Sequence, residues 1–184
     1  MQEEEPIDGI LGELMAWAAA ARAAEGASER SRTRSLLEQA VADATWSGLM
    51  VDLAEDEAPV IVKTAAARWT GRLVGTGQDF VVLERPSAGP VLLRLESVIS
   101  IGRSGDSVRV NAAAGNRPPP LSLDLAGALE GLVAEGSPVT VWAAGEAIRG
   151  RLTGAGRDLV SVRPEGSRSD LYLRLGALDA VELR

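Results

Sequence analysis

The sequence predicts a mainly β fold with N-terminal helices (α+β), in which a small five-stranded antiparallel barrel is built twice. The first observation behind this prediction is an internal repeat. A shift of 79 positions aligns residues 59–81 with residues 138–160 and gives 11 identities in 23 positions. The second observation is that short strand-like segments, bounded by glycine, proline and aspartate, follow one another closely in both copies. Such a pattern is typical of one small β unit that is present twice.

The N-terminal residues predict an acidic helical arm over residues 1–45. Apolar side chains recur at helical spacing over residues 6–25, which predicts a first helix. Gly26 and the polar run 28–34 predict either an interruption or a solvated stretch, before a second helix that starts near Ser35. The arm is therefore expected to consist of two helices rather than one.

Residues 46–102 predict the first helix-plus-barrel repeat. A short helix is expected at its start, because the apolar positions of residues 46–53 match those of residues 125–132 under the same shift. The glycines at positions 71 and 75 recur in the second copy, and glycine allows a strand to bend sharply because it has no Cβ. The strand signals are Val60–Thr64, Trp69–Val74, Asp79–Arg85, Pro90–Leu95 and Val98–Ile101.

Residues 103–120 predict a Gly/Pro-rich linker, and residues 121–184 predict the second helix-plus-barrel repeat. The linker contains three consecutive prolines, which disfavour regular structure. After one inserted residue the repeat continues, so that Leu93–Leu95 matches Leu173–Leu175. The strand signals of the second copy are Val139–Ala143, Ile148–Thr153, Asp158–Arg163, Asp170–Leu175 and Ala180–Leu183.

The composition excludes several classes of site. Cysteine and histidine are both absent, which removes disulfides, thiolate metal sites and the usual acid–base catalyst near neutral pH. The acidic start contradicts a secretory signal, and no apolar run reaches the roughly 18 residues of a membrane span. We therefore expect a cytoplasmic protein that is not an enzyme, with no cofactor, metal or membrane partner. An active site built from carboxylates alone stays open as an alternative.

The repeated residues resemble the motifs of the Sm-like small β-barrels, which share much of their pattern with SH3-like barrels. In each copy Gly-Arg-Leu precedes an Asp and an apolar strand, at 71–83 and again at 150–162, which is similar to the first Sm motif. Leu93-Arg94-Leu95 resembles the second motif. The resemblance implies two tandem five-stranded Sm-like (SH3-like) barrels, each preceded by a short helix. A helical N-terminal arm before paired barrels also resembles an uncharacterised actinobacterial protein family, which implies a fold and no activity.

Nucleic-acid binding is the alternative function that the resemblance and the charge pattern suggest. Residues 1–58 carry a net charge of −9, residues 59–120 a net charge of +4 and residues 121–184 a net charge of −2. However, neither copy has the asparagine that holds a base in Sm proteins, and Leu95 and Leu175 replace a glycine of the second motif. The candidate nucleic-acid contacts are Arg72, Arg94, Arg151 and Arg174.

Protein–protein interaction is the function that the sequence favours. An alanine-rich helix of about 18 residues is marginal alone, so the arm is expected to pack on its own barrels or on a second copy, as a homodimer. Trp142 replaces Lys63 on the variable face of the repeat, where it either marks an interface or covers the preceding helix. The candidate interface residues are Leu11, Leu14, Trp17 and Trp142. The sequence thus predicts a non-enzymatic cytoplasmic interaction or scaffold protein; the alternative is a regulatory protein that binds RNA or DNA through the basic face of the first barrel.

Overall fold

The computed structural model describes residues 7–42, 44–105 and 119–184, and for the first helix it describes only part of the side chains. The chain divides into two compact units, Met1–Asp43 and Ala44–Arg184, and we call the second the sheet unit. The core of the predicted linker, residues 106–118, lies outside the described residues. Within the described part of the chain, no helix is both long enough and apolar enough to span a membrane.

The described residues of the first unit form one continuous helix, α1 (Ile7–Ala42), of 36 residues. Gly26 does not interrupt this helix, so the prediction of a second helix that starts near Ser35 is wrong, whereas the polar run 28–34 is an exposed stretch of the same helix, as the alternative had it. Glycine costs only about 1 kcal/mol in a helix interior, and each further residue of a growing helix adds a hydrogen bond. Alanines, glutamates and arginines on both sides of Gly26 favour the helical state, so one glycine does not end it.

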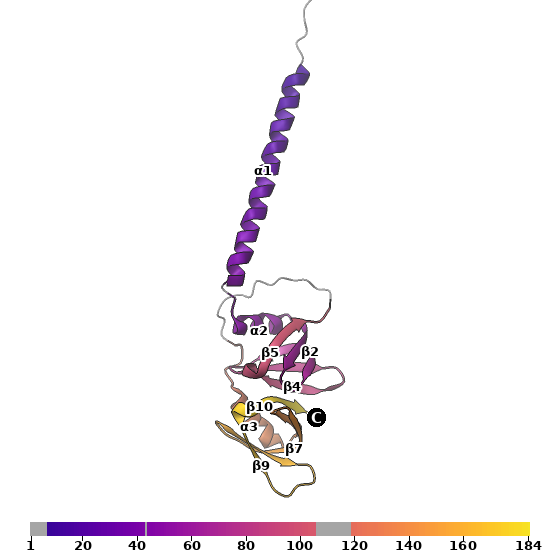
Figure 1. The fold of residues 1–184 in the computed structure, drawn as a ribbon, viewed down its shortest axis with the longest axis vertical. Coiled ribbons are helices and arrows are strands. Elements are labelled where there is room, and N and C mark those ends of the chain that lie inside the picture. The colour runs from indigo at the N-terminus through magenta and orange to yellow at the C-terminus, as the bar shows by residue number, and fades with distance from the viewer. Residues whose placement is uncertain (1–6, 43, 106–118) are drawn as a thin grey trace, which may run out of the picture. The chain divides into compact units, whose positions relative to one another are not determined.

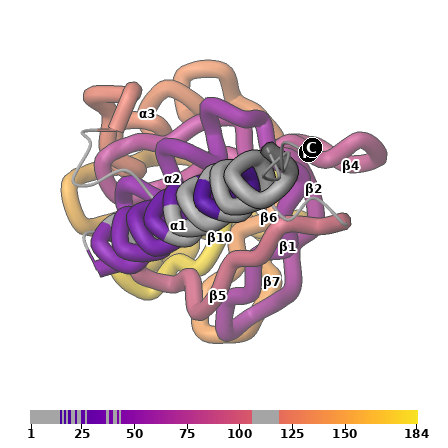
Figure 2. Tube along the Cα trace, turned by 90° about the horizontal axis from the view of Figure 1, so that it is seen from above, coloured from indigo at the N-terminus to yellow at the C-terminus, as the bar shows by residue number. Residues whose placement is uncertain are grey.

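The described residues of the sheet unit form two α-helices, two short 3₁₀-helices and ten strands (Figure 1). Its first half consists of α2 (Trp46–Glu55), β1 (Pro59–Thr64), β2 (Arg68–Thr76), β3 (Phe80–Arg85), β4 (Ala88–Arg94), a 3₁₀-helix η1 (Leu95–Ser97) and β5 (Val98–Arg103). Its second half consists of α3 (Leu125–Glu135), β6 (Pro138–Ala143), β7 (Glu146–Ala155), β8 (Leu159–Pro164), β9 (Leu171–Arg174), η2 (Leu175–Ala177) and β10 (Leu178–Leu183). Figure 2 follows the same elements as a Cα trace, with the first half in purple to pink and the second half in orange to yellow.

The ten strands form one continuous antiparallel open sheet in the order β5-β1-β2-β3-β4-β10-β6-β7-β8-β9. The prediction of two tandem closed five-stranded Sm-like (SH3-like) barrels is therefore wrong, although the prediction of a mainly β fold with helices is confirmed. A closed barrel would need β4 to pair with β5. Instead β10 pairs with the outer edge of β4, with Leu93 opposite Ala180 and Val91 opposite Glu182. Pairing with β10 satisfies the edge of β4 that barrel closure would otherwise have to satisfy.

The two halves of the sheet are built in the same way. Pro59 lies opposite Arg72 in the β1–β2 pair, and Pro138 lies opposite Arg151 in the β6–β7 pair. Gly71 occupies a close approach between β2 and β3, where an added Cβ would overlap the carbonyl oxygen of Glu84. Gly150 occupies the corresponding place in the second half, so both halves need a residue without a side chain there.

Two hydrophobic cores lie in the sheet unit, and each receives side chains from the other half. Helix α2 packs on β2 and helix α3 packs on β7. Successive residues of a strand point to opposite faces. Leu93 therefore packs in the core of the first half, which we call the first core. Leu92 and Phe80 pack in the core of the second half, which we call the second core. In return, Ala180 and Trp142 pack against the first core. The two halves are therefore interlocked and form one body.

Candidate interaction site

Helix α1 exposes large apolar side chains. Met15 and Trp17 are each 72% exposed and Leu36 is 66% exposed. All the described side-chain positions of α1 except Gly26 are exposed. Leu11 and Leu14, which were predicted to share an interface with Trp17, belong to α1, but their side chains lie outside the described residues. An exposed tryptophan offers a large area that a protein partner can desolvate.

Trp142 lies at an interface within the chain. Its ring contacts the ring of Trp69 edge-on, with the ring centroids 5.4 Å apart and the planes at 89°. It is half-buried and packs against the first core, although it comes from β6 of the second half. Trp142 therefore helps to join the two halves and is not free for another protein.

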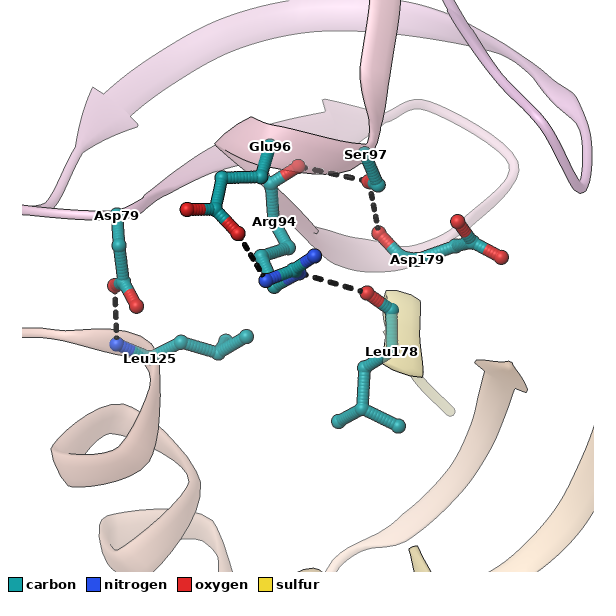
Figure 3. Close-up of polar contacts among 7 residues, drawn as sticks. All are labelled: Asp79, Arg94, Glu96, Ser97, Leu125, Leu178 and Asp179. Atoms are coloured by element: carbon teal, nitrogen blue, oxygen red, sulfur yellow. Dashed lines mark hydrogen bonds and ion pairs between the residues drawn. The ribbon is translucent and has the colours of Figure 1, made fainter. Parts of the chain in front are cut away.

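A polar cluster holds the two halves together where β4 meets the start of β10 (Figure 3). The Arg94 guanidinium donates to the carbonyl oxygen of Leu178 over 3.1 Å and pairs with the Glu96 carboxylate. The Ser97 hydroxyl donates to the carbonyl oxygen of Asp179 over 3.0 Å. Only 19% of the Arg94 side chain is exposed, so this arginine fixes the fold and is not available to a ligand.

Asp79 completes this cluster by capping a helix of the other half. Its Oδ1 accepts a hydrogen bond from the backbone N–H of Leu125, the first residue of α3, over 2.7 Å (Figure 3). A carboxylate at a helix N-terminus satisfies a free N–H group and lies at the positive end of the helix dipole. We call these contacts around Asp79 and Arg94, together with the β4–β10 pairing, the junction.

The four arginines proposed as nucleic-acid contacts do not gather in one place. They lie on β2, β4, β7 and β9, and no two of these strands are neighbours in the sheet. Arg72 is exposed and lies 3.6 Å from the Glu57 carboxylate, and Arg151 donates to the carbonyl oxygen of Gly136. Arg174 is exposed, and no hydrogen bond or ion pair of its side chain is found among the described residues.

Other basic residues of the first half are also engaged within the sheet unit. Arg85 donates to Glu182 over 2.6 Å and Arg103 donates to Asp56 over 2.6 Å. Both arginine side chains are less than one-fifth exposed. Part of the positive charge of the first half is therefore neutralised by carboxylates in structural ion pairs.

A cavity of about 440 Å³ in the second half is lined by residues of β7, the end of β8 and Gly136, the C-cap of α3. Arg151 and Arg163 line it, and Arg163 also forms an ion pair of 2.8 Å with Asp170. The hydrogen bond from Arg163 lowers the pKa of the Asp170 carboxyl below its usual value, and the same bond raises the pKa of Arg163. Asp170 therefore keeps its charge to a lower pH than an unpaired aspartate.

Replacing Arg163 with glutamine is expected to raise the pKa of Asp170 towards that of a free aspartate, because the favoured carboxylate loses its donor. Any stabilisation from the pair is present above the pKa of unpaired aspartate and is lost as pH falls through the lowered value. NMR titration of the Asp170 carboxyl measures this shift. Arg151→Gln is the matched control, since Arg151 lines the same cavity without bonding Asp170. An equal titration of Asp170 in all three proteins would contradict the expectation.

Sequence reasoning missed a set of exposed apolar residues of the sheet unit. They are Trp46, Ile99, Leu159, Leu171 and Tyr172, with exposed fractions from 40% to 66%. The repeat aligns each of them with a residue of the other half, but the sequence alone does not show that the two residues differ in burial. Only the paired structure shows which copy of each position is covered.

The described residues contain no group of three or more acidic side chains that could hold a metal ion. The polar clusters that the structure does show serve the junction or single ion pairs. No protein-family model matches the chain and no curated protein matches its sequence, so the exposed surfaces themselves are the guide to function.

Proposed function

We propose that this chain is a non-enzymatic interaction protein, in which α1 docks on a partner protein or on a second copy. The observation that carries the proposal is the exposure of Met15, Trp17 and Leu36 along a single 36-residue helix. A helix in a protein gains most of its stability by packing an apolar surface against a neighbour. Burying the exposed tryptophan and methionine side chains of α1 against a partner would therefore lower the free energy.

The hydrophobic cores of the sheet unit also support the proposal. It has two hydrophobic cores of its own, and Met50, Leu73 and Phe80 belong to them. Met50, Leu73 and Phe80 are at most 2% exposed. The sheet unit therefore builds its cores without any described side chain of α1.

Nucleic-acid binding by the basic face has weaker support. Arg94 is tied to Leu178, and Arg85 and Arg103 are held by carboxylates. Arg72 and Arg174 keep exposed guanidinium groups, but they come from strands at separate places in the sheet. A phosphate backbone would meet isolated arginines rather than a continuous basic surface.

The combined variant Met15→Gln, Trp17→Gln and Leu36→Gln, called the α1 variant, tests the proposal. Glutamine keeps the helical propensity while removing the apolar contacts. We expect multi-angle light scattering of the full chain to show a loss of mass if copies dock on each other. If a partner protein docks instead, that protein is expected to co-purify with the unchanged chain and to be absent from the purified α1 variant.

The matched control replaces three exposed polar residues of α1, Glu25→Gln, Arg32→Gln and Ser28→Gln, which remove no apolar surface. Circular dichroism checks that both variants remain helical. Identical masses and identical co-purified proteins for the unchanged chain, the α1 variant and the control would refute docking through α1.

A further inference from the structure

At the junction β4 pairs with β10, whereas the strands at the two ends of the sheet have one edge without a partner strand among the described residues. β5 and β9 are the two end strands, and among the described residues neither has a strand on its outer side. In the repeat, β9 corresponds to β4 and β5 corresponds to β10. From this correspondence we infer that copies of the chain associate head to tail, with β9 of one copy pairing with β5 of the next as β4 pairs with β10. The inference goes beyond docking through α1 and does not depend on it.

The end strands carry apolar residues that are covered at the junction. Val91 and Leu92 of β4 are 0% and 6% exposed, whereas their counterparts on β9, Leu171 and Tyr172, are 40% and 66% exposed. β10 shows the same contrast with β5, since Asp179 is 9% exposed and its counterpart Ile99 is 62% exposed. Neither end strand has a proline or a lysine, which commonly protect an edge strand from pairing. The exposed edges are therefore open to strand pairing, and the junction shows what such pairing covers.

Side chains next to the strand edges follow the same pattern. At the junction, Phe80 of β3 packs in the second core with Leu125, the first residue of α3, and both are at most 2% exposed. The counterpart of Phe80 is Leu159 of β8, which is 43% exposed. The counterpart of Leu125 is Trp46, the first residue of α2, which is 42% exposed. Leu159 of one copy would meet Trp46 of the next, and both would be buried.

The polar groups of the junction also have unfilled counterparts. Asp158 corresponds to Asp79, and Arg174 corresponds to Arg94; together with Gly176 they line a cavity of about 420 Å³. Asp79 receives the first N–H of α3, and Arg94 donates to the first carbonyl of β10. Asp158 would therefore accept a hydrogen bond from the first N–H of α2 of the next copy. Arg174 would donate a hydrogen bond to the first carbonyl oxygen of β5 of the same copy.

The first turns of the two helices are alike in the way that this fit requires. Thr45 caps α2 by accepting from the N–H of Gly48 over 3.0 Å, and Asp124 caps α3 by accepting from the N–H of Gly127 over 2.8 Å. In both helices the cap leaves the N–H of the first residue to another acceptor. For α3 that acceptor is Asp79, which lies 46 positions before Leu125 in the sequence.

Charge adds a contact between copies that the junction lacks. Gly176 of η2 faces Arg94, since a Cβ there would lie 4.0 Å from the guanidinium. The counterpart of Gly176 on η1 is Glu96, whose side chain is 76% exposed. Arg174 of one copy would therefore face the Glu96 carboxylate of the next copy, with opposite charges.

Two junction contacts are missing from the contact between copies, which makes it the weaker of the two. Ser97, which donates to Asp179, has the counterpart Ala177, and Glu182, which pairs with Arg85, has the counterpart Gly102. Association between copies is therefore expected to be reversible and to depend on concentration. Because two different edges meet, the contact is heterologous and extends to a closed ring or an open chain.

The test uses the full chain in the α1 variant background, so that docking through α1 does not contribute to the measured mass. Tyr172→Glu blocks the β9 edge and Ile99→Glu blocks the β5 edge. Val74→Glu is the matched control, because Val74 is 40% exposed on β2, a strand paired on both sides. Light scattering over a range of concentrations is expected to show multiples of 19.2 kDa for the background and the control, and 19.2 kDa alone for each edge variant.

Mixing separates pairing of different edges from pairing of like edges. The Tyr172→Glu chain retains a good β5 edge and the Ile99→Glu chain retains a good β9 edge, so their mixture is expected to form a one-to-one pair. Circular dichroism and thermal melting confirm that each variant is folded. A background that stays at 19.2 kDa at every concentration overturns the inference while leaving docking through α1 intact. Edge variants that keep the mass of the background, or a mixture that forms no pair, overturn it as well.

Discussion

Replacing Phe80 with alanine is expected to lower the free energy of unfolding of the sheet unit by about 3–5 kcal/mol. Phe80 is 2% exposed and belongs to the first half of the sequence, yet it packs in the core of the second half. Its removal leaves a cavity in one half and weakens the contact that joins it to the other half. Urea unfolding followed by tryptophan fluorescence measures this loss.

The repeat supplies a matched control for this change at the corresponding position. Leu159 is 43% exposed, so Leu159→Ala is expected to cost only about 0.5 kcal/mol when measured at low protein concentration. Because the cores are interlocked, both variants should still unfold in a single transition. Equal losses for Phe80→Ala and Leu159→Ala, or two separate transitions, would show that the halves do not share their cores.

The second large effect is expected at Arg94. Arg94→Ala removes the hydrogen bond to the carbonyl oxygen of Leu178 and the ion pair with Glu96, in a place where 19% of the side chain is exposed. A hydrogen bond to a charged group contributes about 1.5–3 kcal/mol, so we expect a loss of about 2 kcal/mol in the free energy of unfolding. The same urea experiment measures it.

Arg174→Ala is the control, because Arg174 occupies the corresponding position on the exposed β9 strand. Its removal is expected to leave the stability of a single chain almost unchanged. The pair of variants also bears on the nucleic-acid alternative, which assigned the two arginines the same role. A stable Arg94→Ala chain, or a loss in Arg174→Ala as large as in Arg94→Ala, would contradict the structural role of Arg94.

The sequence predicted the strands well, because their signals are local. Alternating apolar residues such as Val60 and Val62, both fully buried, predict a strand and its inward face without any knowledge of the neighbours. Matching glycines at positions 71 and 150 predicted a bend in each copy, and the structure shows a close backbone approach at both positions. The continuous helix through Gly26 was missed because the penalty for one glycine is small compared with the preference of its neighbours.

The pairing of β4 with β10 could not be read from the pattern in the same way. A strand edge carries no side-chain code for its partner, and β4 would satisfy its backbone groups equally by pairing with β5 or with β10. The burial of Trp142 followed from that pairing and was missed with it. Arg94 and Arg174 are identical in type and position in the repeat, and only the sheet order shows that one is tied and the other is exposed.

The place of β10 has a consequence for how the chain is made. β10 comes after the nine other strands in the sequence, yet it lies between β4 and β6 at the centre of the sheet. A ribosome therefore delivers both flanks before it delivers the strand that connects them. Until then the edges of β4 and β6 that pair with β10 have no partner strand, and a premature stop before Leu178 would leave both edges unpaired.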